Sequence, residues 1–100
     1  MSVTATGINK ILTYMGSVFD KIVLTDATGS LTAEKTPVVT VSTDRVICTA
    51  YFGTDEANFT IKTVQLWAGA NLIAIKDVNV IKTSRQSLTV TRRDYLREAA

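Results

Sequence analysis

The sequence predicts a mainly β fold, an antiparallel β-sandwich or small barrel of about six strands with one N-terminal helix. Threonine, whose β-branched side chain suits the wetter face of a sheet, occupies 16 positions, most of them beside Val, Ile or Leu. Apolar residues alternate with polar ones through most of the chain after Asp20. Turn-forming residues separate these alternating segments about every eight to twelve residues, which is the spacing of antiparallel sandwiches and small barrels.

The length of 100 residues predicts one domain, residues 1–100, with a single thin core. A composition of 46% hydrophobic and 20% charged residues is typical of a globular protein and excludes a disordered chain. Cys48 is the only cysteine, so the sequence holds no intramolecular disulfide. The domain must therefore be stable without covalent cross-links, or be stabilised by assembly with other subunits.

Residues 7–19 are predicted to form the N-terminal helix. Apolar residues recur there at steps of three and four, namely Ile8, Ile11, Leu12, Met15, Val18 and Phe19. Gly16 weakens the pattern, because a glycine inside a helix costs about 1 kcal/mol relative to alanine, and it can instead mark the end of the helix. We expect the apolar stripe to cover a sheet. A membrane-surface helix is the alternative, but Lys10 is the only cation on the polar face.

Six strands are predicted, over residues 21–25, 38–42, 45–52, 59–68, 72–83 and 87–93. Residues 26–37 contain Gly, Ser and Asp and are predicted to form one long loop. Alternation fails near Lys62 and Thr63, which predicts a β-bulge, and Trp67 then points away from Leu66. Gly69–Asn71 is predicted to be a tight hairpin turn. Residues 94–100 are predicted to form a C-terminal arm.

Strand 45–52 carries apolar residues at both sets of alternating positions. Val46, Cys48, Ala50 and Phe52 share one face, and Ile47 and Tyr51 lie on the other. We therefore expect this strand to be central and to be covered on both sides.

The residue types exclude most catalytic chemistry. The sequence has no histidine, which removes the usual Ser-His-Asp and Cys-His systems and most zinc, copper and non-haem iron sites. Cys48 lies in an apolar strand without a neighbouring base, so a buried, inert thiol is expected. No glycine-rich phosphate loop is present. We predict no catalytic residue, no cofactor site and no metal site, and therefore no enzyme activity.

Two adjacent carboxylates, Asp55 and Glu56, pose the question of a catalytic pair. In an extended chain, adjacent side chains point to opposite faces, whereas two catalytic carboxylates converge on a substrate from different elements. The neighbouring Asn58 favours a turn, because Asp and Asn side chains bond their own backbone. We predict that this segment is the tip of a hairpin.

Five residues are predicted to contribute to a subunit interface: Trp67, Arg92, Arg93, Tyr95 and Arg97. From Lys82 onward the chain has five basic and two acidic residues, a local excess of +3 that can dock a segment onto a neighbour. The net charge of +2 is too small to indicate a nucleic-acid partner. Trp67 is expected to fill a second sheet face or an interface, and a sugar-stacking platform with Tyr51 is the alternative.

Several short motifs follow one another in the order found in small structural proteins of tailed bacteriophages and prophages. They are Gly7-Ile8-Asn9 with Ile11-Leu12, Glu56-Ala57-Asn58 with Thr60-Ile61, Gln65-Leu66-Trp67, Leu72-Ile73-Ala74, and Ile81-Lys82-Thr83-Ser84 with Leu88-Thr89-Val90-Thr91. The chain therefore resembles this family of tail-fibre, baseplate and appendage proteins over roughly residues 7–91. It departs from the pattern at the loop after residue 23, and at Gln65, where glycine is common.

The resemblance implies a non-enzymatic virion component of the tail, baseplate, neck or fibre region that is made in the host bacterial cytoplasm. Its expected partners are further copies of itself and other virion proteins, with contacts through Trp67, the 26–37 loop and the 94–100 arm. A glycan- or cell-surface-binding module and a capsid decoration protein are the alternatives. No signal peptide and no apolar run of the ~20 residues of a membrane span is visible, so no membrane partner is expected.

Overall fold

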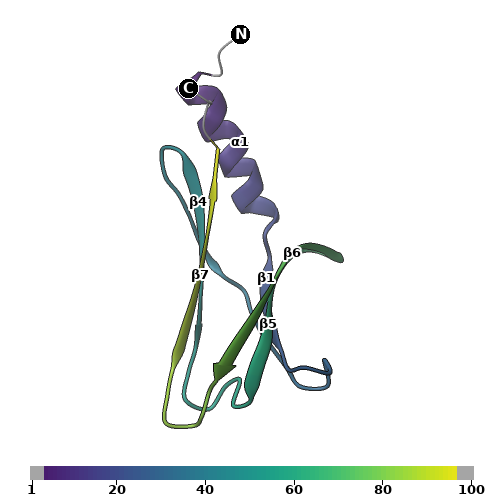
Figure 1. Cartoon of the computed structure of the whole chain (residues 1–100). Coiled ribbons are helices and arrows are strands. Elements are labelled where there is room, and N and C mark those ends of the chain that lie inside the picture. The colour runs from purple at the N-terminus through teal and green to yellow at the C-terminus, as the bar shows by residue number, and fades with distance from the viewer. Residues whose placement is uncertain (1–3, 97–100) are drawn as a thin grey trace.

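The computed structural model describes residues 4–96, which form an elongated body of 50 × 25 × 23 Å (Figure 1). The described residues form one helix and seven strands: α1 (Ala5–Val18), β1 (Lys21–Thr25), β2 (Thr32–Lys35), β3 (Val38–Val41), β4 (Arg45–Phe52), β5 (Thr60–Ala68), β6 (Asn71–Ile81) and β7 (Leu88–Tyr95).

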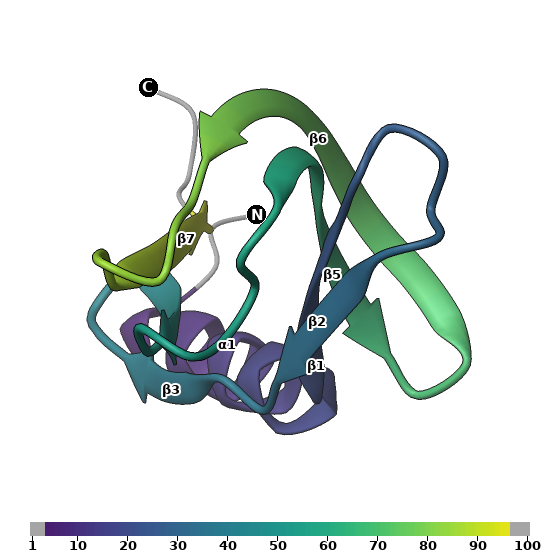
Figure 2. The same cartoon turned by 90° about the horizontal axis from the view of Figure 1, so that it is seen from below.

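The strands form two antiparallel sheets, which confirms the predicted mainly β fold with one N-terminal helix. The four-stranded sheet has the order β2-β1-β5-β6, and the three-stranded sheet has the order β3-β4-β7. Successive hairpins along the chain alternate between the sheets: β1–β2 lies in the first sheet, β3–β4 in the second and β5–β6 in the first. The last strand, β7, then pairs with β4 in the second sheet. This arrangement is a small β-sandwich (Figure 2).

The core lies between the two sheets, on what we call their inner faces. Alternate residues of β4 point inward and are buried, from Val46 to Phe52. Ile22 and Leu24 of β1 and Ile61 and Leu66 of β5 meet them from the four-stranded sheet. One end of the three-stranded sheet extends past the four-stranded sheet, and α1 covers this end in contact with β3 and β4 (Figure 1).

The helix α1 begins at a side-chain cap and packs through a glycine. Thr4 is extended, and its Oγ1 accepts a hydrogen bond from the Gly7 N–H at 3.0 Å, which satisfies one free donor of the first turn. Gly16 does not end the helix, which continues to Val18. It is buried instead, because a Cβ at this position would lie 2.8 Å from Val39 Cγ1 on β3. The close approach of helix and sheet therefore requires the glycine.

The prediction of one long loop over residues 26–37 is wrong, because this segment contains the strand β2. Residues Thr32–Lys35 pair antiparallel with β1, and Asp26 to Leu31 form the turn between the two strands. Gly29 has a positive φ of 75° in this turn. Two of the four β2 residues are charged, so the sequence lacks the apolar alternation by which the other strands were recognised. An edge strand needs few apolar residues, since one of its sides has no strand neighbour.

The predicted β-bulge of β5 is confirmed, and a second irregularity that was not predicted follows it. The β5–β6 register shifts between Ile61 and Thr63, at the expected bulge, and again between Leu66 and Trp67. Gly69, with φ of 61°, begins the two-residue turn into β6. The strand β7 continues to Tyr95, so the first two residues of the predicted 94–100 arm belong to the sheet. Residues 97–100 of that arm lie outside the described residues.

The strand β4 is central in its sheet, as predicted, but it is covered on one side rather than on both. Its inner face is buried, whereas Tyr51 on the opposite, outer face is 59% exposed. Neither α1 nor the four-stranded sheet lies over this outer face (Figure 1).

Candidate assembly surface

Two edge strands, β6 and β7, stand on the same side of the sandwich and belong to different sheets. Their paired neighbours are β5 and β4, respectively. They converge at the loop that joins Ile81 to Leu88 and separate toward the helix end of the molecule (Figure 1). Between them lies a cleft of about 390 Å³, which we call the β6–β7 cleft.

The β6–β7 cleft is mainly apolar. Ala74, Val78 and Val80 of β6 line one wall, and Leu88 and Val90 of β7 line the other. Its charged lining residues are Lys76, Arg92 and Arg93, all of them basic. The cleft exists because β6 and β7 diverge, which separates two apolar inner faces that would otherwise meet.

The strand β6 also exposes apolar side chains on its outer face. Ile73, Ile75 and Ile81 are 50%, 55% and 69% exposed, and Leu72 beside Trp67 is 45% exposed. Most exposed strands alternate between a buried apolar face and a wet polar face. β6 instead has apolar residues on both faces while forming the edge of its sheet, which is typical of a surface that a neighbour covers.

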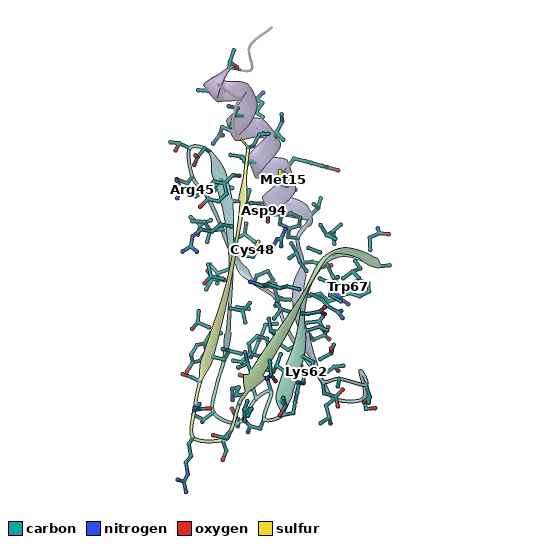
Figure 3. The ribbon with its side chains drawn as sticks, viewed as in Figure 1. Met15, Arg45, Cys48, Lys62, Trp67 and Asp94 are labelled. Carbon is teal, nitrogen blue, oxygen red and sulfur yellow. The ribbon has the colours of Figure 1, made fainter. Side chains whose placement is uncertain are left out.

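Trp67 lies on the outer face of the four-stranded sheet, away from the buried Leu66, as predicted (Figure 3). Its Nε1–H donates to Gln65 Oε1 at 2.9 Å, and Gln65 Nε2 donates to Thr63 Oγ1 at 3.4 Å. The Lys21 ammonium lies 5.2 Å from the ring centroid. One face of the indole therefore already has a cationic partner, which disfavours a sugar-stacking role for that face.

The remaining predicted interface residues are divided between the two faces of β7. Arg92 points inward beside Cys48, and its Nε and Nη2 donate to both carboxylate oxygens of Asp94 at 3.0 and 2.8 Å. Arg93 takes the alternate position on β7, opposite Ile47, and also lines the edge of the cleft. The Tyr95 ring packs against the Arg45 guanidinium at 5.1 Å.

The structure therefore does not bring the five predicted residues into one site. Trp67 lies on the outer face of the four-stranded sheet, apart from β7 (Figure 3). Arg97 is outside the described residues.

Cys48 is buried, as predicted. Burial raises the pKa of its thiol, and the nearby Asp94 carboxylate acts in the same direction. The thiol is therefore held in its protonated, unreactive form.

The segment with Asp55 and Glu56 is a turn, but the prediction of a hairpin tip is wrong. β4 and β5 belong to different sheets, so the segment crosses from one sheet to the other. Glu56 Oε1 accepts from the Gly53 N–H at 3.0 Å, and its other oxygen pairs with Lys35 of β2. These interactions of the carboxylate stabilise the β4–β5 crossing, the segment that joins the two sheets. They leave Glu56 without a catalytic partner among the described residues.

Lys82 is a structural residue that the sequence did not reveal. It is 4% exposed, and its ammonium donates to Asn58 Oδ1 at 2.8 Å and to the Thr83 carbonyl at 3.5 Å. The bond to Asn58 joins the start of the β6–β7 loop to the β4–β5 crossing. The two residues are far apart in sequence, and the short motifs that contain them do not indicate that they pair, so no local signal identifies the bond.

The Glu56 ion pair predicts acid sensitivity. The hydrogen bond from Lys35, followed by that from the Gly53 N–H, lowers the pKa of Glu56 below its ordinary value of 4.5. A lowered folded-state pKa stabilises the fold above the unfolded-state value, and this contribution is lost as the pH falls through the folded-state value. We expect Glu56→Gln to unfold at a lower urea concentration than the wild type at pH 7, and the difference to shrink below pH 4.5.

Asp55→Asn is the matched control, since Asp55 is exposed and adjacent. It should leave the urea midpoint at pH 7 close to that of the wild type. An equal loss in both variants would mean that the Lys35 contact does not stabilise the crossing.

The described residues contain no group of three or more Cys, Asp or Glu side chains that could hold a metal ion. Within residues 4–96, no helix has both the length and the apolar character needed to cross a membrane. Comparisons of the chain with family models, curated proteins and solved structures found no match.

Proposed function

We propose that this protein is a non-enzymatic structural subunit of a phage virion, in the tail, baseplate, neck or fibre region, that acts by self-assembly and by docking to other virion proteins. The observation that carries the assembly part of this proposal is β6, an edge strand of 11 residues with apolar side chains exposed on its outer face. The resemblance of the sequence motifs to small tailed-phage proteins supports the virion part.

An edge strand of this kind is unfavourable for a protein that remains alone. It presents unpaired backbone groups, and Ile73, Ile75 and Ile81 add apolar surface beside them. Monomeric proteins protect such edges with short strands, proline or charge, whereas β6 is the longest strand described and carries one lysine and one aspartate. Covering β6 with another subunit removes both costs, which favours an assembly role.

The chemistry of the described side chains supports a role without catalysis. The sequence has no histidine, and Cys48 is buried and protonated. Arg92 and Glu56, which could serve as catalytic charges elsewhere, are each bound to a partner of opposite charge. These interactions stabilise the fold and provide no convergent set of reactive groups.

The structure supports the two alternative functions, a glycan-binding module and a capsid decoration protein, to different degrees. A glycan-binding module depends on the aromatic platform at Trp67, and the Lys21 ammonium over that ring reduces the area available for a sugar. A capsid decoration protein has the same surface chemistry as a tail component. The two are distinguished by the position of the labelled protein on intact particles.

Replacement of Ile75 by lysine tests the role of β6. Ile75 is 55% exposed on the outer face, so we expect Ile75→Lys to fold normally and to weaken self-association at least tenfold, because a charge enters an apolar contact. Sedimentation equilibrium over a concentration series measures the change.

Ile11→Lys, the same substitution at a 47% exposed position on α1, is the matched control and should associate as the wild type does. Equal association of both variants would remove β6 from the interface. Absence of the protein from washed virions of the source phage would contradict the virion assignment itself.

A further inference from the structure

We propose that the β6–β7 cleft is an acceptor groove for one extended β-strand of another structural protein, which pairs with the free edge of β7 and carries an acidic residue on its inward face. This inference rests on the proposed structural role and specifies how a partner docks.

The two sheets differ by one strand on the side of the cleft. On the opposite side, residues 36 and 37 connect β2 directly to β3, so the sheets meet there. On the cleft side, the four-stranded sheet ends in β6 and the three-stranded sheet ends in β7. One strand added beside β7 would make the second sheet four-stranded and would lie opposite β6. The space opposite β6 that the three-stranded sheet leaves uncovered therefore has the width of a single strand.

The free edge of β7 provides the backbone partner. Within residues 4–96, β4 is the strand that pairs with β7, through a register that runs from Arg45–Tyr95 to Phe52–Leu88. Among the described residues, no strand lies along the other edge of β7, whose residues line the cleft. An extended segment can form main-chain hydrogen bonds along such an edge, as in β-strand addition.

The dimensions of the cleft fit a row of side chains. Its β7 wall extends from Leu88 to Arg93, about 17 Å at roughly 3.3 Å per residue. The opposite wall is formed along β6, from Ala74 to Val80. Two strands therefore bound the cleft along its length, which matches the inward face of a third strand better than a compact ligand.

The charges of the cleft select the kind of strand. Lys76 points to the inner face, because it lies opposite Val64, which in turn lies opposite the buried Leu24. A strand that covers the cleft would bury this ammonium, which costs free energy unless the ammonium gains a partner of opposite charge. Arg92 is already bound by Asp94, whereas Lys76 forms no ion pair with any residue between positions 4 and 96. A strand with an acidic residue opposite Lys76 removes this cost, so charge determines which partner is accepted.

Synthetic peptides test the groove without knowledge of the natural partner. The probe is a labelled eight-residue peptide of alternating valine and threonine with one central glutamate. The matched probes carry lysine in place of the glutamate, or are N-methylated at alternate backbone nitrogens. We expect the glutamate peptide to bind at least tenfold more tightly than the lysine peptide, as measured by fluorescence anisotropy. The N-methylated peptide should not bind, because it cannot form the strand hydrogen bonds.

Two variants of the protein assign the binding to the cleft. Lys76→Glu should reverse the preference between the charged peptides, whereas Lys10→Glu, the same change on the exposed helix surface, should not alter it. Amide hydrogen exchange should show new protection in β7 when the glutamate peptide is bound. Unchanged circular dichroism and urea midpoints establish that both variants remain folded.

Several outcomes would overturn the proposal. They are no binding of the glutamate peptide, equal binding of the charged peptides, binding of the N-methylated peptide, or protection outside β7. Protection of β7 by rising protein concentration alone would identify a second copy as the occupant and would equally overturn it. These experiments use the protein at concentrations at which it is monomeric, so a failure here is distinct from a failure of the β6 association test.

Discussion

Replacement of Phe52 by alanine should lower the free energy of unfolding by about 3–5 kcal/mol, the usual cost of deleting a buried phenylalanine. Phe52 is 0% exposed and lies at the end of β4, opposite Leu88 of β7. It belongs to the core cluster that includes Ile22, Leu24 and Ile61 of the other sheet. Its removal would leave a cavity at the junction of the sheets, and urea unfolding monitored by circular dichroism would measure the loss.

Tyr51→Ala is the matched control for this substitution. Tyr51 is the preceding residue on the same strand, but its side chain is 59% exposed on the outer face. We expect it to cost less than about 1 kcal/mol, as do most surface substitutions. Equal losses for the two variants would contradict the placement of the core on the inner face of β4.

Replacement of Leu12 by alanine should cost about 2–5 kcal/mol, because it removes the buried anchor of α1. Leu12 is 0% exposed and lies one helical turn before Gly16, which contacts Val39 of β3. The two positions therefore form the contact between the helix and the three-stranded sheet. Loss of this contact should lower the urea midpoint and increase amide exchange throughout α1.

Tyr14→Ala provides the control on the same helix, since Tyr14 is 70% exposed. It should leave the urea midpoint nearly unchanged. If Leu12→Ala increased exchange in α1 without lowering the overall midpoint, the helix would open independently, and the two layers would not unfold as one unit.

Apolar, β-branched segments bounded by turn-forming residues made several strands predictable from the sequence. The strands 21–25 and 45–52 were predicted with the bounds that β1 and β4 have, because each such segment is followed directly by Asp26 or Gly53. The outward position of Trp67 also followed from alternation after the bulge. β2 was missed, because an edge strand with Glu34 and Lys35 needs little apolar character.

Strand partners could not be predicted in the same way. The β4–β5 segment has the length and composition of a hairpin turn, yet it joins two sheets. The local sequence indicates which residues form turns, but it contains little information about which strands pair when they are far apart in the chain. The β6–β7 cleft and the Lys82–Asn58 bond both depend on those distant pairings, so alternation and turn patterns did not indicate either one.

The alternating placement of hairpins in the two sheets has a consequence for folding. The β1–β2, β3–β4 and β5–β6 hairpins connect neighbouring segments and need short loop closures. The β4–β7 pairing joins Arg45 to Tyr95, fifty positions apart, and β1–β5 joins Lys21 to Trp67. Such non-local contacts slow folding, to milliseconds or longer in comparable β proteins. During synthesis, β4 therefore keeps an unpaired edge until the ribosome has released β7, and this interval is when the nascent chain most needs protection from aggregation.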